Sequence, residues 1–406
     1  MGLLCTAACS DDDAGSGGKV ENQNTRDNAE VLGTKKAAAG EPVKVGFVSD
    51  GRGPAIDNTH QAVAADGVVS YVNDYLGGIA GRPVELVKCE TRFDPGKATE
   101  CADEFVQEGV AGVLMPENAT ALPVFEVLKA NKIPLFAYGV GDSALLLDDE
   151  VMFSLVDPIG GLADSPISIA EDQDLDKVTV VVVDVPAATT FYRTIAPDIF
   201  DEAGLELEVI AIPPDQADLT PQMTEIANGD PTSVHIVGQD SFCIAGINGL
   251  FGAGFDGPIS MLSGSCDTDA VKTALKDKLE GVYVSSATAN GDIEDEGIEL
   301  WNAIVDEYGV DVEPDKGMTT FITVLAFRRA LESLTGDVTP ASVRSTIRAM
   351  EPAPLPGGGG MDFRCSGKAR PLLPAVCANG NLRSQLDDTG ETTLPWTLVG
   401  NDPIPA

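Results

Sequence analysis

Histidine is almost absent from this sequence, whose 406 residues contain only His60 and His235. His60 falls within a predicted helix and His235 within an apolar strand, so we interpret both as structural. A Ser-His-Asp or Cys-His catalytic site needs such a residue as its base. No Gly-x-x-x-x-Gly-Lys-Ser/Thr or Gly-x-Gly-x-x-Gly segment opens a helix after a strand either. We therefore predict a protein that is not an enzyme and binds no cofactor.

Long apolar runs and positive charge are scarce as well. No stretch of about 20 uninterrupted apolar residues occurs, so no segment is predicted to span a bilayer. The chain has 26 Lys and Arg residues against 64 Asp and Glu, a formal net charge of -38 at pH 7. Such a charge repels nucleic-acid phosphates and anionic lipid head groups. We expect no nucleic-acid partner and no electrostatic docking to membranes, and we attribute the acidity to solubility.

The N-terminal residues place a cysteine directly after small side chains. Thr6, Ala7 and Ala8 precede Cys9, and acidic and Gly/Ser-rich sequence follows it. This arrangement resembles the lipobox of bacterial lipoproteins, which implies that Cys9 carries lipid and anchors the protein to the outer face of the cytoplasmic membrane. The basic and apolar parts of a secretory signal are missing or cut short before Cys9. The same residues also match a myristoylation pattern, which is frequent by chance.

The other six cysteines form three couples that are close in sequence: Cys89 with Cys101, Cys243 with Cys266, and Cys365 with Cys377. Six cysteines allow 15 pairings, and we predict disulfide bonds within these neighbouring couples. A zinc site would need Cys-x-x-Cys spacing or nearby histidines, so we predict no metal. Free buried thiols are the remaining alternative. Disulfide bonds would imply an oxidising compartment outside the cytoplasm.

Short β-branched runs alternate with helical stretches from residue 43 onward, which is typical of repeated βαβ units. The first series has predicted strands at 43–48, 84–87, 110–115, 133–137 and 152–156, with helices at 60–75, 95–108 and 121–130. The second has strands at 178–183, 205–212, 233–237, 258–262 and 281–285, with helices at 190–203, 219–228, 243–253 and 269–278. Three further helices at 294–308, 318–335 and 340–350 precede a Pro/Gly-rich tail with short strands near 361–364 and 396–399. The pattern predicts an α/β protein with two doubly wound parallel-sheet lobes.

Four segments carry a more specific resemblance. Residues 43–54 (VKVGFVSDGRGP), 77–87 (GGIAGRPVELV), 94–98 (DPGKA) and 133–135 (IPL) resemble the leucine/isoleucine/valine-binding protein family, the type I periplasmic binding proteins, and the similarity extends over 43–348. The resemblance implies two lobes joined by three crossovers. It also implies the solute-binding component of an ABC importer, with permease subunits and an ATPase as partners. We expect a monomer.

The resemblance also suggests how the chain is divided. We predict a leader at 1–42, lobe one at 43–158 plus 288–355, and lobe two with the C-terminal tail at 159–287 plus 356–406. Hinge residues near 157–160, 286–290 and 352–360 would absorb the rotation as the lobes close. A sensor subunit for a membrane signalling protein remains an alternative function. An exported hydrolase on a similar frame is a further alternative, which the lack of a histidine base opposes.

Open α/β sheets bind ligands beyond the carboxyl ends of their strands. The loops that leave the predicted strands are polar and glycine-rich, at 49–54, 117–120, 138–143, 184–190, 239–242 and 263–265. Helix capping explains many of their Ser, Thr, Asn and Asp residues, but six such loops facing one cleft favour binding. The candidate ligand-binding residues are Arg52, Asn118, Thr120, Tyr138, Gly139, Gly141, Thr189, Gln239 and Ser263.

The residues that would hold an amino acid are only partly present in this sequence. The resemblance implies that residues 118–120 and about Gly141 hold an amino acid's α-carboxylate, and that an acidic residue at about Ser263 holds its ammonium. Gly141 lacks a hydroxyl and Ser263 lacks a charge. The expected ligand is therefore a small polar solute: an amino acid, an amide, a carboxylate or a urea-like compound. Arg52 is the one cation in these loops and could hold a carboxylate, with a solvated surface arginine as the alternative.

Overall fold

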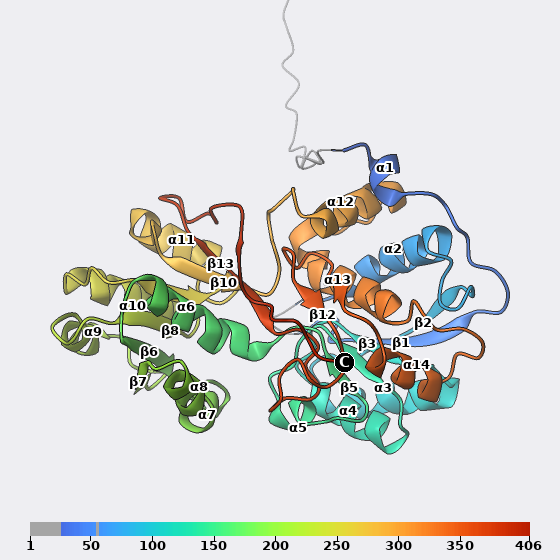
Figure 1. Cartoon of the computed structure of the whole chain (residues 1–406), viewed down its shortest axis with the longest axis horizontal. Coiled ribbons are helices and arrows are strands. Elements are labelled where there is room, and N and C mark those ends of the chain that lie inside the picture. The colour runs from blue at the N-terminus through green and yellow to red at the C-terminus, as the bar shows by residue number, and fades with distance from the viewer. Residues whose placement is uncertain (1–25, 54–56) are drawn as a thin grey trace, which may run out of the picture.

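The computed structural model describes residues 26–53 and 57–406, and two large sheets organise them (Figure 1). The first sheet has five parallel strands in the order β2-β1-β3-β4-β5. Their bounds are β1 Val43–Ser49, β2 Val84–Glu90, β3 Val113–Met115, β4 Leu135–Ala137 and β5 Met152–Ser154.

The second sheet has seven strands in the order β14-β13-β10-β9-β8-β6-β7. Five are parallel: β6 Lys177–Val183, β7 Glu206–Ile212, β8 Ser233–Val237, β9 Ile259–Leu262 and β10 Tyr283–Ser286. β13 (Gly380–Gln385) and β14 (Thr397–Gly400) extend this sheet in antiparallel fashion. The two sheets confirm the predicted α/β class with two doubly wound lobes.

Helices cover both faces of the first sheet. α2 (His60–Tyr75), α12 (Glu296–Tyr308) and α13 (Pro314–Ala330) lie together on one face, and α3 (Pro95–Glu108) and α4 (Ala121–Ala130) pack together on the other (Figure 1). Every residue of β3, β4 and β5 is buried because both faces are covered. Phe136 of β4 packs against Phe327 of α13, with ring centroids 5.4 Å apart. The remaining helices of this lobe are α1 (Asn28–Leu32), α5 (Ser143–Leu146) and α14 (Pro340–Arg348).

The second sheet is covered in the same way. α6 (Ser165–Asp172), α7 (Pro186–Thr194) and α8 (Ala196–Glu202) pack on one face, and α9 (Thr220–Ala227), α10 (Asp240–Gly252) and α11 (Asp269–Leu275) lie on the other (Figure 1). Short helical turns η1 (Gly160–Asp164) and η2 (Lys276–Leu279) complete the lobe. In β6 the residues from Val178 to Val182 are fully buried, as expected for a strand covered on both faces, and the strand predicted at 178–183 is confirmed.

The C-terminal tail contacts both lobes. After the small β11 (Ala353–Pro354) and β12 (Asp362–Phe363) pair, the chain runs along β5, where the Ser154 amide donates to the Ala375 carbonyl and the Cys377 amide donates to the Ser154 carbonyl, both at 2.8 Å. It then enters the second sheet through β13. The predicted division of the chain between the lobes stays a prediction.

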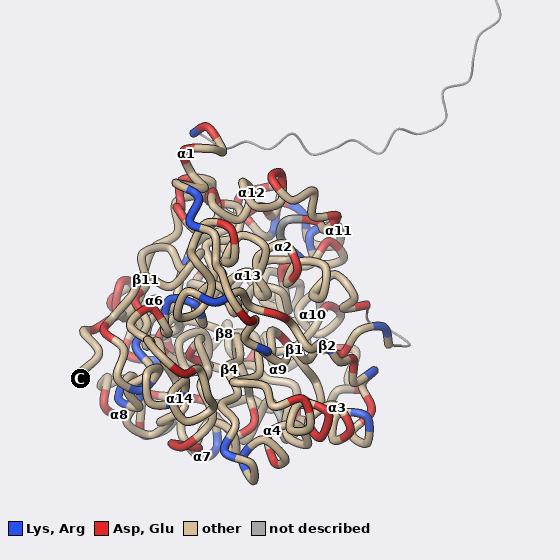
Figure 2. The backbone as a smooth tube through the Cα atoms, turned by 90° about the vertical axis from the view of Figure 1, so that its right-hand side faces the viewer, with Lys and Arg blue, Asp and Glu red and all other residues tan. Residues whose placement is uncertain are grey.

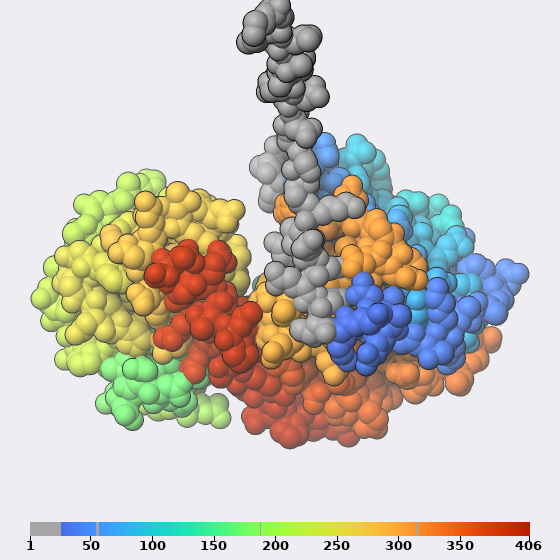
Figure 3. Space-filling model, turned by 90° about the horizontal axis from the view of Figure 1, so that it is seen from above, coloured from blue at the N-terminus to red at the C-terminus, as the bar shows by residue number. Residues whose placement is uncertain are grey.

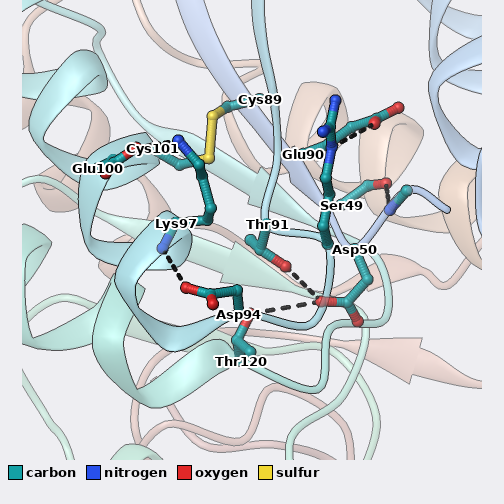
Figure 4. Close-up of a disulfide and its surroundings, with 12 residues drawn as sticks. Ser49, Asp50, Cys89, Glu90, Thr91, Asp94, Lys97, Glu100, Cys101 and Thr120 are labelled. Atoms are coloured by element: carbon teal, nitrogen blue, oxygen red, sulfur yellow. Dashed lines mark hydrogen bonds and ion pairs between the residues drawn. A yellow bond between two sulfur atoms is a disulfide. The ribbon is translucent and has the colours of Figure 1, made fainter. Parts of the chain in front are cut away.

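The three predicted cysteine couples are bonded in the structure. Cys89–Cys101 joins β2 to α3 (Figure 4), Cys243–Cys266 joins α10 to the loop after β9, and Cys365–Cys377 closes a loop of the tail. The side chain of Asp94 caps α3 beside the first bond by accepting from the Lys97 amide at 2.9 Å. The predicted lipidation residue Cys9 and most of the predicted leader lie outside the described residues.

Candidate functional site

A cavity of about 700 Å³ lies between the two lobes. Figure 3 shows the groove that separates the lobe of β6–β10, in green and yellow, from the lobe in blue and orange. The wall is rich in hydroxyl and amide groups, from Ser263, Ser265, Ser285, Ser286, Thr288 and Thr319 and from Asn58, Asn290 and Asn381. Its charged and aromatic members among the described residues are Asp57, His60, Glu117, Tyr138, Asp157 and Lys316. This volume suits a small solute.

The wall residues come from strand ends because parallel strands finish at the same edge of a sheet. Glu117 follows β3 and Tyr138 follows β4 in the first lobe, while Ser263 follows β9 in the second. The crossover segments that leave β5 and β10 add Asp157 and Thr288. Each lobe therefore supplies one side of the cavity, and the connections between the lobes supply its floor.

Asp50 fixes the loop that carries Glu117. Its side chain is buried just beyond β1, where it accepts from the Thr91 hydroxyl at 2.6 Å (Figure 4). It also accepts from the Ala119 amide at 2.7 Å. These bonds join the loops that follow β1, β2 and β3. Asn118 turns back into its own loop and accepts from the amide and the hydroxyl of Thr120, at 2.8 and 2.9 Å. The loop is thereby held rigidly at the rim of the sheet.

Burial changes the acidity of several wall groups. The surrounding protein raises the pKa of Glu117 above its usual value. Burial also raises the pKa of Tyr138, and the nearby Glu117 charge raises it further. Burial raises the pKa of Asp157 to about 6, against the opposing effect of Arg370, which forms an ion pair with it. Of the acidic wall residues, Asp157 alone is buried, whereas Asp57 and Glu117 are open to water.

Comparison with known proteins identifies the family. The sequence matches the profile of the periplasmic binding proteins over residues 42–374. The chain belongs to the periplasmic binding protein family. The resemblance found in the sequence is therefore confirmed, and the cavity lies between the two lobes of such a binding protein. A search among curated proteins finds no match.

Solved structures share the fold of this binding protein. A putative branched-chain amino acid ABC transporter protein from Rhodospirillum rubrum is 16% identical with a TM-score of 0.73, over 87% of this chain and 100% of that one. LivJ from Streptococcus pneumoniae, solved with isoleucine, is 15% identical with a TM-score of 0.64, over 88% and 99%. A substrate-binding protein from Desulfitobacterium hafniense, solved with Leu, is 16% identical with a TM-score of 0.65, over 88% and 100%. At these identities the likeness establishes the fold alone.

Two of the residues predicted to bind ligand, Tyr138 and Ser263, lie in the cavity wall of the binding protein. Ser263 donates to Asp267 at 2.9 Å. Gly139 lies beside the wall, where a Cβ atom would come within 2.7 Å of Val156 Cγ2. Glycine is therefore required there for packing rather than for a hydroxyl contact.

The other predicted ligand residues lie outside the cavity wall. Arg52 is exposed and pairs at 2.8 Å with Asp57, which does line the cavity. Thr189 is buried and donates to the Val185 carbonyl of its own helix at 3.1 Å. Gln239 is exposed at the start of α10, with no side-chain cap bond. Asn118 and Thr120 bond to each other behind the wall, and Gly141 is absent from it. Their roles in binding stay predictions.

Sequence reasoning missed His60, Glu117 and the segment after β10. His60 is the first residue of α2 and lines the cavity, where a purely structural role had been expected. The position of His60 directly after the loop that follows β1 was the sequence signal that could have placed it in the cavity wall. His235 does have a structural setting: it is fully buried, its Nδ1 lies 2.8 Å from the Ser260 hydroxyl, and burial lowers its pKa to about 4.

Within residues 26–53 and 57–406, no group of three or more His, Cys, Asp and Glu side chains is arranged to hold a metal ion. No helix in that part of the chain combines the length and apolar character needed to cross a membrane.

Proposed function

We propose that this periplasmic binding protein is the extracytoplasmic solute-binding component of an ABC importer, and that it captures a small polar solute by closing its two lobes. The observation that carries the proposal is the cavity of about 700 Å³, whose hydroxyl- and amide-rich wall is built from both lobes. A solute that touches both walls favours the closed form, because only that form satisfies both sets of polar groups.

One buried acceptor of the described wall has no hydrogen-bond donor. The Asn290 side-chain carbonyl is buried without a hydrogen-bond donor among the described residues. Such an acceptor is costly to leave unpaired. A solute donor at this point would supply the missing bond, which supports binding as the role of the cavity.

Catalysis has little support by comparison. His235 is paired with Ser260 inside the second sheet, where both residues are buried and no substrate can reach them, which leaves His60 of the cavity wall as the one histidine that a substrate could meet. A hydrolase would need a nucleophile and a base that face the cavity together. The described wall offers hydroxyls from many loops, which suits the recognition of several polar atoms of a solute.

An amino acid is the first solute class to test, because LivJ from Streptococcus pneumoniae and the Desulfitobacterium hafniense protein were solved with isoleucine and Leu. Amides and carboxylates are the next solute classes to test, because the cavity wall is polar. The three disulfide bonds agree with an oxidising compartment. Anchoring through lipid on Cys9 belongs to the same proposal, and mass spectrometry of the mature N-terminus would reveal the acyl groups.

Small-angle scattering tests the capture mechanism. A thermal-shift screen of amino acids, amides and carboxylates first identifies solutes that bind. Saturation with a binding solute should then reduce the radius of gyration, since the lobes rotate toward each other. An unchanged scattering profile at saturation, for every solute that binds, would contradict the closing mechanism.

A further inference from the structure

A second cavity lies at the far end of helices α2 and α13. It has a volume of about 250 Å³, and the loop after α2, the C-terminal end of α13 and Lys36 of the segment before β1 form its wall. Both helices begin at the solute cleft, where His60 and Lys316 line the wall, and they run roughly 20 Å before they reach this cavity. The cavity, called the α2–α13 pocket below, is therefore separate from the cleft.

Two cations line the α2–α13 pocket, and neither is paired with a carboxylate in the described part of the chain. The ammonium group of Lys36 has no ion pair and no hydrogen bond there. Arg328 donates from Nη2 to the Leu76 carbonyl at 3.1 Å, but its Nε–H is buried without an acceptor. A buried donor on a charged group is costly to leave unpaired. The pocket thus holds positive charge that the described protein does not compensate.

The loop after α2 adds backbone donors to this wall. Gly77, Ala80 and Gly81 line the pocket, and their amides donate to no acceptor among the described residues. Gly77 has a φ of +72°, and a Cβ atom added to it would lie 3.3 Å from Lys36 Cε. The lysine stem therefore packs directly on the loop backbone. Free amides in a turn of this kind are a common setting for bound anions.

The acidic residue of this wall leaves the two cations free. Glu332 lines the pocket too, but it is exposed and forms no ion pair with Lys36 or Arg328. Its charge acts on the neighbouring Arg329. Figure 2 shows acidic positions spread over most elements of the chain, as the net charge of -38 requires. Because carboxylates are so abundant here, two cations that share a pocket without one indicate a site for an anion from outside the chain.

We propose that the α2–α13 pocket binds a phosphate-type oxyanion, either a free anion or the phosphate group of a lipid. Ammonium groups, guanidinium groups and free amides are the donors that proteins use for phosphate. Together the donors of Lys36, Arg328 and the loop exceed the roughly four lone-pair positions of a carboxylate, which favours a group with more oxygens. The volume is smaller than that of cavities that enclose drug-sized ligands, so a single small group fits best.

Inorganic phosphate is the first probe. The full chain, dialysed free of phosphate, is titrated by calorimetry at an ionic strength kept constant with NaCl. We expect saturable binding at millimolar phosphate. Lys36→Gln should weaken it by about fivefold or more, because an exposed cation of the wall is lost. Lys35→Gln is the matched control: it removes the same charge one residue away, from a side chain that lies outside the wall and pairs with Glu307. This control should bind phosphate as the wild type does.

Arg328→Lys supplies a second variant. It keeps the charge and most of the stem, but it loses the planar fork that can hold two oxygens at once. Phosphate binding should weaken about as much as in Lys36→Gln. Because Arg328 is half-buried, its melting temperature is compared with that of the wild type, and Lys36→Gln tests the site without touching a buried contact.

Vesicles separate the two sources of the phosphate group. The full chain with Cys9→Ser, which cannot carry lipid at that residue, is floated with vesicles of phosphatidylcholine alone or with added phosphatidic acid. Flotation that needs phosphatidic acid, and that Lys36→Gln abolishes while Lys35→Gln does not, would assign the pocket to a lipid phosphate. Phosphate binding in solution without flotation would assign it to a free anion.

Two results would overturn the proposal. One is phosphate affinity that Lys36→Gln leaves at the wild-type value, since the anion would then bind elsewhere on the chain. The other is the absence of both saturable phosphate binding and flotation with phosphatidic acid. Neither result would affect solute capture in the cleft, because the two cavities share no wall residue.

Discussion

The guanidinium of Arg370 forms an ion pair with the carboxylate of Asp157, which lies at the first crossover between the lobes and lines the cavity. Arg370 also pairs with Asp164 at the end of η1. The Asp157 side chain is completely buried, and it further accepts from the Ile159 amide at 2.9 Å. A residue of the C-terminal tail therefore holds the segment that is predicted to be a hinge.

Loss of this arginine should destabilise the protein strongly. In Arg370→Met the side-chain stem remains, but Asp157 and Asp164 are left without their cation. Breaking a buried ion pair in this way costs about 3–5 kcal/mol of unfolding free energy. Arg193→Met is the control, because its pair with Asp184 is about half exposed and such pairs contribute under about 1 kcal/mol. Urea denaturation should separate the two variants, and equal losses would refute a special role for Arg370.

His235 should make the protein sensitive to acid. Its pKa in the fold is about 4, below the usual value of 6.5, because burial disfavours the charged ring. A group whose pKa is lowered by folding stabilises the protein fully at pH values above its pKa in the unfolded chain. This stabilisation is lost as the pH falls toward the pKa of the group in the folded protein. The contribution should therefore decline by about 3 kcal/mol between pH 6.5 and pH 4.

Variants of the two histidines isolate this effect from that of the many carboxylates. Unfolding free energies measured from pH 4 to pH 7 should fall less steeply in His235→Gln than in wild type. His60→Gln should keep the wild-type pH dependence. A steep wild-type profile in His235→Gln would show that other groups cause the acid sensitivity.

Both lobes should contribute to ligand affinity. Tyr138→Phe removes a hydroxyl from lobe one, and Ser263→Ala removes one from lobe two. Each should weaken binding of a solute found in the screen by about 1 kcal/mol, the usual net value of one hydrogen bond. Gln239→Ala serves as the comparison, since the structure places this side chain outside the wall. Calorimetry measures the affinities of the three variants. A loss of affinity in Gln239→Ala alone would support the sequence-based prediction that Gln239 binds the ligand.

Two disulfide bonds with the same loop length should differ in their effect on binding. Cys89–Cys101 and Cys365–Cys377 both span 12 residues, so removing either by double serine substitution should cost about 3 kcal/mol of stability. The second loop contains Arg370, which holds Asp157 at the cavity. Only its removal should also weaken solute binding. Equal solute affinities in the two variants would show that the tail loop does not influence the binding site.

Local patterns predicted the parallel core well, because those strands have sequence signatures of their own. The run that forms β6 is apolar apart from Lys177 and Thr179, and its centre is buried on both faces. β13 was missed, since Gly380–Gln385 contains one large apolar residue, Leu382, and becomes a strand through pairing with the distant β10. The site shows the same limit. Tyr138 was found from its place at a strand end, but the place of Glu117 in the cavity wall depends on how the loops of both lobes lie in space.

The late position of β13 in the chain affects how the second lobe is made. β10 ends at Ser286, whereas the strand that pairs with its free edge begins at Gly380. During synthesis and export the edge of β10 stays open until the helices α12 to α14 and the tail have followed it. An open sheet edge is a template for pairing with other chains. In the interval before β13 arrives, the edge of β10 can therefore pair with other chains.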